Sequence, residues 1–363
     1  MDAESFPAEP TTVEPTPGES APGSLTPGQP GPGAPAPGAP GAGSPVPGGP
    51  APDGLTLAEL TPGALPAVVD LCRRALDLPE DSAEAAALVD TLHTRASADR
   101  TVLGLVAYRG AEPVGVLIAS LATAEPVVGH VDLVAVAPEL RRRGVGRALL
   151  ARAERGLAER GATEVLLAGN PPYYVWPGID VRYTPAVCAA LALGYRQDRT
   201  AWNMTADLSY DESPALRTTE PAERRLAERG ITVRRAEPAD LPALVAFARS
   251  TFGGAWDGEL AGSVGRPGAG AHLAERDGAV LGFAAWGSSR PSWFGPMGTA
   301  PEAEGTGIGG VLLRRCLRDQ RAEGVKTAQI GWVGPVPFYS RSAGARIERV
   351  FFLYRKALPP VGG

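Results

Sequence analysis

One segment of this 363-residue chain occurs twice, and this repeat constrains how the chain can fold. Residues 137–150 align without a gap with residues 300–313, at a constant offset of 163 (300 − 137). The same offset relates Gly161 to Gly324. Self-similarity at a long, fixed period indicates two copies of one structural unit.

The repeat extends toward the N-terminal side of both copies. Leu55-Thr56-Leu57 aligns with Ile231-Thr232-Val233 at an offset of 176 (231 − 55). The first unit therefore carries 13 additional residues (176 − 163), which we place around 81–100. A chain of this length has room for two domains with separate cores. The predicted segments are a disordered arm (1–53), a first domain (54–208), a charged linker (209–229), a second domain (230–358) and a tail (359–363).

The composition narrows the classes of partner. Residues 1–53 consist largely of Pro-Gly, Gly-Ala-Pro and Ala-Pro units, which offer almost nothing to bury, so we expect this arm to be disordered. The arm lacks the charged start and apolar stretch of a signal peptide, and no apolar run reaches the ~18 residues of a membrane helix. Net charge is −5, with no basic stripe outside residues 141–143, which argues against nucleic acid. We expect a cytoplasmic protein; the sequence does not predict its oligomeric state.

The three cysteines give no sign of a disulfide or metal site. Cys72, Cys188 and Cys316 form no CxxC pair. Each lies in an apolar helical pattern, where cysteine usually acts as a small core residue. We therefore expect no bound metal.

Each copy of the repeated segment is typical of a strand, a glycine-containing turn and a helix. Apolar residues return with helical spacing at Val145 and Leu149, and at Ile308 and Leu312. The glycines thus lie at a helix N-terminus, where backbone N–H groups are unpaired and the helix dipole is positive. Because glycine allows close approach to the backbone, an anion such as pyrophosphate fits there. The alternative is an ordinary turn that needs glycine only for its backbone angles.

Two better-known glycine motifs are excluded. Gly305, Gly307 and Gly310 satisfy GxGxxG, but the dinucleotide fingerprint requires its glycines directly after a strand, and residues 301–304 intervene. Neither copy has the Gly-Lys-Ser/Thr of a P-loop. Both copies share the longer pattern xxGxGxxLL after Ala-Pro-Glu.

This pattern resembles the signature of the GNAT acyltransferase superfamily, (Arg/Gln)xxGx(Gly/Ala) after the fourth strand. Arg141, Gly144 and Gly146 match all three fixed positions, whereas the second copy has Glu304 in place of Arg or Gln. A carboxylate beside a pyrophosphate is unfavourable, so the second loop is the weaker candidate. The resemblance implies an α+β fold in three layers: two tandem GNAT domains, each a mixed, mostly antiparallel sheet flanked by helices.

The resemblance also implies acetyl-CoA as co-substrate. Three strand residues and two loops are then expected to bind it. The strand residues are Val134, Val136 and Thr299. The loop residues are Arg141, Arg142, Arg143, Gly144, Val145, Gly146 and Arg147 in the first unit and Gly305, Thr306, Gly307, Ile308, Gly309 and Gly310 in the second.

Acetyl transfer from a thioester needs a general acid to protonate the leaving thiolate. Tyrosine, with an ordinary pKa of about 10, suits this task. In the superfamily the acid is often the Tyr of a Phe-Tyr pair shortly before a glycine, and Phe338-Tyr339 before Gly344 matches. Tyr339 is therefore the predicted acid, with simple packing in a helix as the alternative. The first unit has no tyrosine at the corresponding position.

Two aspartates are candidates for the base that accepts the amine proton. Asp132 lies within the apolar run of residues 131–136, where burial would raise its pKa into a useful range. Asp180 belongs to a long insertion, residues 170–183, found only in the first unit. The alternatives are a solvated strand end for Asp132 and a turn cap for Asp180.

Aromatic residues mark a candidate acceptor site. The residues are Tyr173, Tyr174 and Trp176 in the insertion and Trp332 in the second unit. Aromatic rings beside a carboxylate suit a sugar or an amino sugar. The alternative is that the insertion fills the seam between the two domains.

Within the superfamily, segments 294–299 and 330–339 look like those of bacterial tandem-domain glucosamine/glucosaminide N-acetyltransferases. The sequence therefore predicts an acetyl-CoA-dependent N-acetyltransferase that acts on a primary amine of a small molecule, with amino sugars among the candidates. One alternative is a protein that binds acetyl-CoA without catalysis, as a sensor or scaffold. Another is an enzyme similar to mycothiol synthase. Which unit is catalytic stays open.

Overall fold

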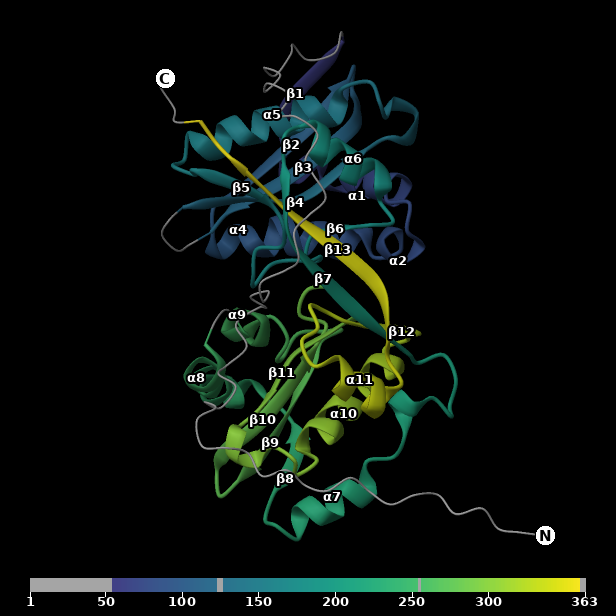
Figure 1. The fold of residues 1–363 in the computed structure, drawn as a ribbon, viewed down its shortest axis with the longest axis vertical. Helices are drawn as coiled ribbons and strands as arrows, with labels where there is room; N and C mark the ends of the chain where they lie inside the picture. Colours follow the sequence, from purple (N-terminus) through teal and green to yellow (C-terminus); the bar gives the residue numbers. More distant parts are fainter. Residues whose placement is uncertain (1–53, 123–126, 254–255, 360–363) are drawn as a thin grey trace, which may run out of the picture.

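The structure is a computed structural model that describes residues 54–122, 127–253 and 256–359. Figure 1 shows two units stacked along the long axis, each with its own helices around a sheet. The first unit comprises β1 (Leu55–Glu59), η1 (Pro62–Ala64), α1 (Leu65–Ala75), α2 (Pro79–Ser82), α3 (Ala85–Val89), η2 (Asp90–Arg95), α4 (Ala96–Asp99), β2 (Val102–Arg109), β3 (Glu112–Leu121), β4 (Val128–Val136), η3 (Pro138–Leu140), α5 (Val145–Ala158), β5 (Glu164–Leu167), β6 (Ile179–Asp180), α6 (Thr184–Ala192) and β7 (Arg196–Asp207).

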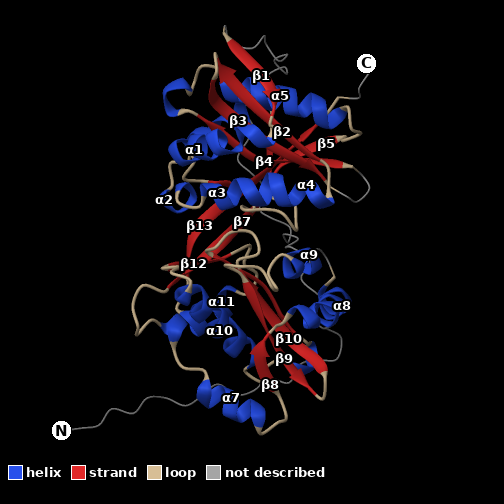
Figure 2. Ribbon diagram, turned by 180° about the vertical axis from the view of Figure 1, so that it is seen from behind, coloured by secondary structure: helices blue, strands red, loops and turns tan. Residues whose placement is uncertain are grey.

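The second unit repeats this order with fewer helices before its hairpin. It comprises η4 (Pro214–Leu216), α7 (Glu220–Ala227), β8 (Thr232–Arg235), η5 (Pro238–Asp240), α8 (Leu241–Phe252), α9 (Trp256–Ala261), β9 (Gly270–Arg276), β10 (Ala279–Trp286), β11 (Trp293–Thr299), η6 (Pro301–Ala303), α10 (Ile308–Ala322), β12 (Thr327–Ile330), α11 (Val336–Ala343) and β13 (Arg346–Ala357). Its strands lie between α8 and α9 on one side and α10 and α11 on the other (Figure 2).

The periodicities predicted from the sequence produce the expected elements. The apolar runs 102–108 and 114–120, and 272–276 and 280–286, are each joined by a short polar or glycine-containing turn, which predicts two hairpins. They are confirmed as β2–β3 and β9–β10, both antiparallel. In α5, Val145, Leu149 and Ala153 are buried, as their helical spacing predicts. A Cβ at Gly115 of β3 would lie 2.9 Å from Val145 and 3.0 Å from Leu149, so glycine permits this close packing of helix on sheet.

The last strand of each unit pairs with the sheet of the other unit. β13 pairs antiparallel with β5, placing Tyr354 opposite Leu167. β7 pairs antiparallel with β12, placing Met204 opposite Ile330. β7 and β13 also pair with each other and lie side by side where the two units meet (Figure 1). The described residues therefore form one continuous 13-stranded sheet.

The structure tests the core positions predicted for the three cysteines. Cys72 and Cys316 are buried core residues, but Cys188 is exposed, so the prediction of a core position for Cys188 was wrong. The apolar pattern of α6 gave a wrong prediction because only Ala190 of that helix is buried.

The predicted disordered arm, 1–53, lies outside the described residues. Within the described ranges, none of the helices combines the length and apolar character needed to cross a membrane.

Candidate active site

The two glycine loops have the same backbone conformation. In the first unit, Arg142 has φ 64° and Gly144, the residue before α5, has φ 86°. In the second unit, Gly305 and Gly307 have φ 71° and 94°. Two left-handed residues separated by one position turn the chain sharply from the strand into the helix. The second loop has glycine where the first holds Arg142 in this costly conformation.

The main-chain amides of both loops are free. In the described structure, the N–H groups of residues 142–147 and 305–310 donate to no backbone carbonyl. The first intrahelical bonds start later, from Ala148 N to Gly144 O at 2.9 Å and from Val311 N to Gly307 O at 3.3 Å. Successive free amides at the positive end of a helix form an anion-binding concavity. The geometry therefore agrees with the function expected for these loops.

Each loop follows a strand whose last residues have no pairing strand on one side. β4 and β5 pair in parallel only from Val128 to His130, and β4 then continues alone on that side to Val136. β11 and β12 likewise separate after Phe294. Val134 is 36% exposed, and Thr299 is partly exposed on the corresponding part of β11. The strand residues predicted to bind acetyl-CoA thus lie along the two splits that lead to the loops.

Arg141 has a different environment from the rest of its loop. Its guanidinium donates to the carboxylate of Asp77 at 2.9 and 3.0 Å and to the carbonyl of Ala75 at 2.7 Å. Arg141 therefore ties the loop to the end of α1. Its main-chain N–H donates to the carbonyl of Pro138 at 3.3 Å, so the free amides of this loop begin at Arg142. The other charged side chains of the loop, Arg142, Arg143 and Arg147, are exposed, as is Glu304 at the position of Arg141 in the second unit.

Asp132 lies on β4 immediately after the split begins. It is 9% exposed; Ser120 Oγ donates to its Oδ2 at 2.6 Å, whereas Oδ1 is buried without a partner. Burial raises the pKa of Asp132 to about 7, although Arg100 and the Ser120 hydrogen bond act in the opposite direction. Nearby, burial lowers the pKa of His130 to about 4, so this imidazole is neutral. Asp132 is thus a carboxyl group able to exchange a proton near neutral pH.

Asp180 is an ion-pairing residue. Its Oδ2 accepts from Arg349 Nε at 2.7 Å and from Arg182 Nη2 at 2.9 Å, and its Oδ1 accepts from the Arg182 main-chain N–H. The last bond is the turn cap considered above as the alternative. Because both oxygens are engaged by arginines, this carboxylate is a poor acceptor for an amine proton. The structure does not favour Asp180 as the base.

Tyr339 lies on α11, beside the split of the second unit. Its ring packs edge-on against Phe294, the last residue of β11 that pairs with β12, with centroids 6.2 Å apart. Phe338 faces the start of α10, since a Cβ at Gly309 would lie 3.4 Å from its ring. Burial raises the pKa of Tyr339 above its ordinary value, which keeps the phenol protonated. A protonated phenol near the split suits the predicted acid.

The aromatic residues of the insertion lie at the seam between the units. Tyr174 is 6% exposed and packs edge-on against Trp293 and Trp332 of the second unit, with centroids 5.6 Å apart in both pairs. Trp176 donates its indole N–H to Asp81 at 3.2 Å. The ring of Tyr173 lies under the guanidinium of Arg100, 5.4 Å away. The seam-filling interpretation describes Tyr174, which contacts two tryptophans of the second unit, whereas Trp176 and Tyr173 contact Asp81 and Arg100 of their own unit.

Three polar residues near the splits were not predicted. Ser120 bonds to Asp132 as described, and Asn170 Nδ2 donates to Ser120 Oγ at 2.9 Å, extending this network into the insertion. Glu259 on α9 is 4% exposed, and burial raises its pKa to about 8. Nothing in the local sequence distinguishes these residues, because the residues that surround them in the fold lie far away along the chain.

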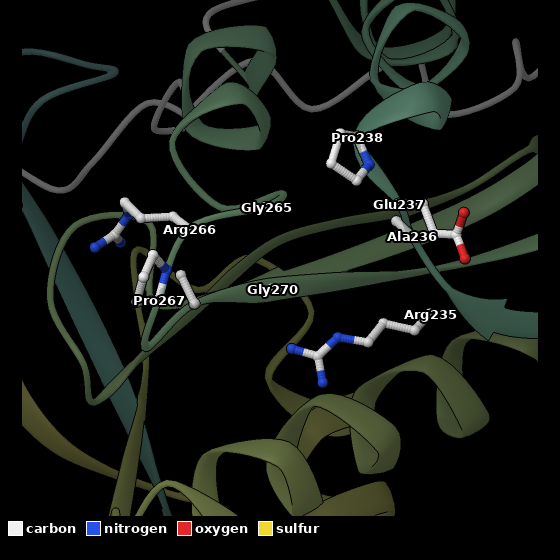
Figure 3. Close-up of a pocket in the computed structure, with 9 residues that line it drawn as sticks. Arg235, Ala236, Glu237, Pro238, Gly265, Arg266, Pro267 and Gly270 are labelled. Atoms are coloured by element: carbon white, nitrogen blue, oxygen red, sulfur yellow. The ribbon is translucent and has the colours of Figure 1, made fainter.

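A shallow hollow on the second unit lies elsewhere. Figure 3 shows its lining residues on the segments 235–238 and 265–270. Arg235 in this hollow pairs with Asp319 at 3.2 Å, near the C-terminal end of α10. The glycine loop precedes the opposite end of that helix, roughly 16 Å away at 1.5 Å per residue. This hollow is therefore separate from the loop and the split.

Comparison with known proteins supports the same fold. Residues 68–172 match the profile of the acetyltransferase (GNAT) family. A solved GCN5-related glucosamine N-acetyltransferase region of a fungal multi-domain GH3 β-N-acetylglucosaminidase is 19% identical with a TM-score of 0.66, over 84% of this chain and 38% of that one. A tandem GNAT protein from clavulanic acid biosynthesis is 18% identical with a TM-score of 0.62, over 84% of this chain and 99% of that one.

A GCN5-related N-acetyltransferase from Sphaerobacter thermophilus is similar to the same extent. It is 19% identical with a TM-score of 0.57, over 85% of this chain and 97% of that one. A search of curated proteins gave no significant match. At these identities the solved structures establish the fold. Residues 68–172 therefore match the acetyltransferase (GNAT) family, and the chain as a whole has the fold of the tandem GNAT protein it resembles.

Proposed function

We propose that this protein is an acetyl-CoA-dependent N-acetyltransferase that acts on a primary amine of a small molecule. The observation that carries the proposal is the pair of loops with free amides at residues 142–147 and 305–310, each at the end of an unpaired strand. The pyrophosphate of acetyl-CoA fits the amides. Its extended arm, which contains amide groups, fits the unpaired edge of a strand, as in peptide binding by strand addition.

Each split has one residue that suits one of the two proton transfers of the reaction. The amine nitrogen attacks the thioester carbonyl, the C–S bond breaks, and one proton moves in net terms from nitrogen to sulfur. Asp132, with a free Oδ1 and a pKa of about 7, is the proposed proton acceptor in the first unit. Tyr339 is the proposed proton donor to the sulfur in the second unit.

Amino sugars are the first acceptors to test. The solved structure with the highest TM-score of the three compared above is described as a glucosamine N-acetyltransferase region. Tyr174 and Trp332 also place aromatic rings beside the split of the second unit, where a sugar ring would pack with its C–H face.

The experiment is to measure thiol release from acetyl-CoA in the presence of glucosamine, polyamines or peptides, together with equilibrium binding of acetyl-CoA. We expect binding, and turnover with at least one amine. Binding without turnover for any amine would favour a sensor or scaffold. The first unit has no tyrosine at the position of Tyr339, and this feature favours the same class. Absence of binding would contradict the proposal.

A further inference from the structure

Glu259 is a buried acidic residue without an ionic partner. It is 4% exposed, and no described side chain forms an ion pair with its carboxylate. Ser263 Oγ donates at 2.8 Å to the main-chain carbonyl of Glu259, and not to its carboxylate. Buried carboxylates are normally paired or hydrogen-bonded, because removing a charge from water is costly. The packing of the fold therefore does not by itself explain why this carboxyl group is buried without an ion-pair partner.

Its helix faces the place where the second sheet splits. α9 packs against β11, the strand that separates from β12 after Phe294. Tyr174 bridges this split, since its ring contacts Trp293 on β11 and Trp332 just beyond β12. Burial raises the pKa of Tyr174 well above its ordinary value, and the charge of Glu259 acts in the same direction.

The insertion of the first unit reaches the same helix. A Cβ at Gly258 would lie 2.5 Å from Pro172 Cγ, so α9 and the segment around Pro172 are in direct contact. This contact lies one residue from Glu259 and two residues from Tyr174. The first unit therefore builds part of the wall around the split of the second unit.

The second unit lacks a carboxylate on its split strand. Gly295 occupies the position of Asp132 at the offset of 163 (295 − 132), while the proposed acid, Tyr339, is present only in this unit. An acetyl transfer in the second unit therefore needs a proton acceptor from another element. Glu259 is an acidic side chain on α9, the helix that packs against this strand.

We propose that Glu259 binds the acceptor amine in the second unit and accepts its proton, and that Tyr174 of the first unit forms one wall of this acceptor site. This inference rests on the proposed function and deepens it. The neutral amine forms the C–N bond as the C–S bond breaks. Its nitrogen loses one proton to the Glu259 carboxylate, and the sulfur takes one from Tyr339. The proton on Glu259 then returns to the Tyr339 phenolate through solvent, so the balance closes.

The surroundings define the class of acceptor. The rings of Tyr174 and Trp332 pack against each other at this split, and within the described residues the carboxylate of Glu259 has no ion-pair partner. This combination favours a primary amine carried on a ring or chain with an apolar or C–H-rich face. An acceptor with a carboxylate or phosphate next to its amine would be repelled.

The test uses the full chain with Glu259→Gln and Tyr174→Leu, and with Glu228→Gln as the matched control at an exposed glutamate of the second unit. Initial rates are measured with glucosamine and acetyl-CoA, and binding of each is measured separately by calorimetry. We expect Glu259→Gln to lower kcat/KM for glucosamine by about 100-fold or more and leave the Kd of acetyl-CoA unchanged. Tyr174→Leu removes the aromatic wall and should raise KM for glucosamine, and Glu228→Gln should behave as the unchanged protein.

The outcomes separate this inference from the proposed function. If the unchanged protein acetylates glucosamine and Glu259→Gln does so within twofold, the inference is overturned and the proposed function stands. If no amine is acetylated, glucosamine binding decides: loss of binding in Glu259→Gln alone supports the acceptor site. Equal binding in both proteins, or no binding in either, overturns it. Should Glu259→Gln fail to fold, Tyr174→Leu tests the acceptor site: an unchanged KM for glucosamine overturns the inference.

Discussion

Arg290 of the second unit and Asp81 of the first unit form an ion pair in which neither side chain is exposed. Nη1 of Arg290 lies 2.8 Å from Oδ1 of Asp81, and both side chains have 0% exposure. Arg349 also pairs with Asp81, at 2.8 Å. Burial alone would raise the pKa of Asp81, but the two arginines outweigh it and lower that pKa to about 2. This pair fixes the seam along which the two units meet.

Replacing one partner of this pair should destabilise the protein strongly. Arg290→Ala leaves Asp81 buried with one guanidinium fewer, and losing one partner of a buried pair typically costs about 3–5 kcal/mol. The free energy of unfolding is measured by urea denaturation. Arg73→Ala is the control, because the Arg73–Asp70 pair is 55% and 67% exposed and should contribute at most about 1 kcal/mol. Equal effects of the two changes would contradict this account of the seam.

The glycine loops predict a defect in acetyl-CoA binding. Gly144→Asp and Gly307→Asp each place a carboxylate beside the free amides and force a side chain onto φ 86° or 94°. We expect each change to weaken binding at its own loop by at least about tenfold, or 1.4 kcal/mol. Calorimetry on the single and double variants counts the sites and assigns each one to a unit.

Matched controls separate backbone strain from the loss of the anion site. Gly161 and Gly324, which follow α5 and α10, have φ 91° and 88°, and a Cβ at either would contact nothing within 4 Å. Gly161→Asp and Gly324→Asp therefore impose similar strain and the same charge far from the loops. If they weaken binding as much as the loop variants do, the loops are not the binding sites.

The phenol of Tyr339 predicts a defect in catalysis alone. Tyr339→Phe removes the proposed proton donor but keeps the ring that packs against Phe294. We expect kcat to fall by about 100-fold or more, with the Kd of acetyl-CoA unchanged. Stopped-flow or steady-state thiol release measures the rate. Tyr354→Phe, at a buried tyrosine on β13, is the control and should retain activity.

The buried carboxyl of Asp132 predicts how stability depends on pH. Its folded pKa of about 7 lies above the ordinary 3.8, so between these values the folded chain holds a proton that the unfolded chain has lost. Stability should therefore fall as pH rises from about 4 to 7 and level off above 7. Asp132→Asn should remove this decline, which amounts to roughly 4 kcal/mol at most.

Urea denaturation at several pH values between 4 and 8 measures the effect. Asp211→Asn serves as the control because the Asp211 side chain is 84% exposed. Parallel pH profiles for Asp132→Asn and the unchanged protein would show that Asp132 does not keep its proton in the folded state.

Much of the site was predictable because its signals are local. The offset of 163 and the glycine spacing identified both loops, and the structure gives Arg142 and Gly305 the same left-handed backbone. The hairpins and the helix after each loop followed from apolar periodicity. In each case the residues that determine the structure lie within a few positions of one another.

The remainder depended on contacts that local patterns do not encode. Asp180 was a plausible base until Arg349, 169 residues away, proved to occupy its carboxylate. Glu259 lies in a short helix, and the contact of its neighbour Gly258 with Pro172 joins this helix to the first unit, a contact across 86 residues of sequence (258 − 172). Cys188 shows the reverse case: its apolar helix indicated a core position, yet it is exposed.

The sequence also did not predict the exchange of β7 and β13, in which each strand pairs with the sheet of the other unit. Both strands have 12 residues and end their units, and either one has a pattern suitable for pairing within its own unit. Strand patterns specify which face is buried, not which neighbour is chosen. The repeat therefore predicted two units but not the sheet they share.

This shared sheet predicts that the two halves depend on each other. Expressed alone, residues 54–208 would lack β13, the strand that pairs with β5, and residues 209–363 would lack β7, the strand that pairs with β12. Each half would also expose one side of the buried Arg290–Asp81 pair. We expect each half to be unstable alone, and the two together to form a complex that binds acetyl-CoA. Circular dichroism and co-purification of the separately tagged halves measure this. Cooperative unfolding and acetyl-CoA binding by a single monomeric half would mean that its own last strand can replace the exchanged one, and the exchange would then be dispensable for folding.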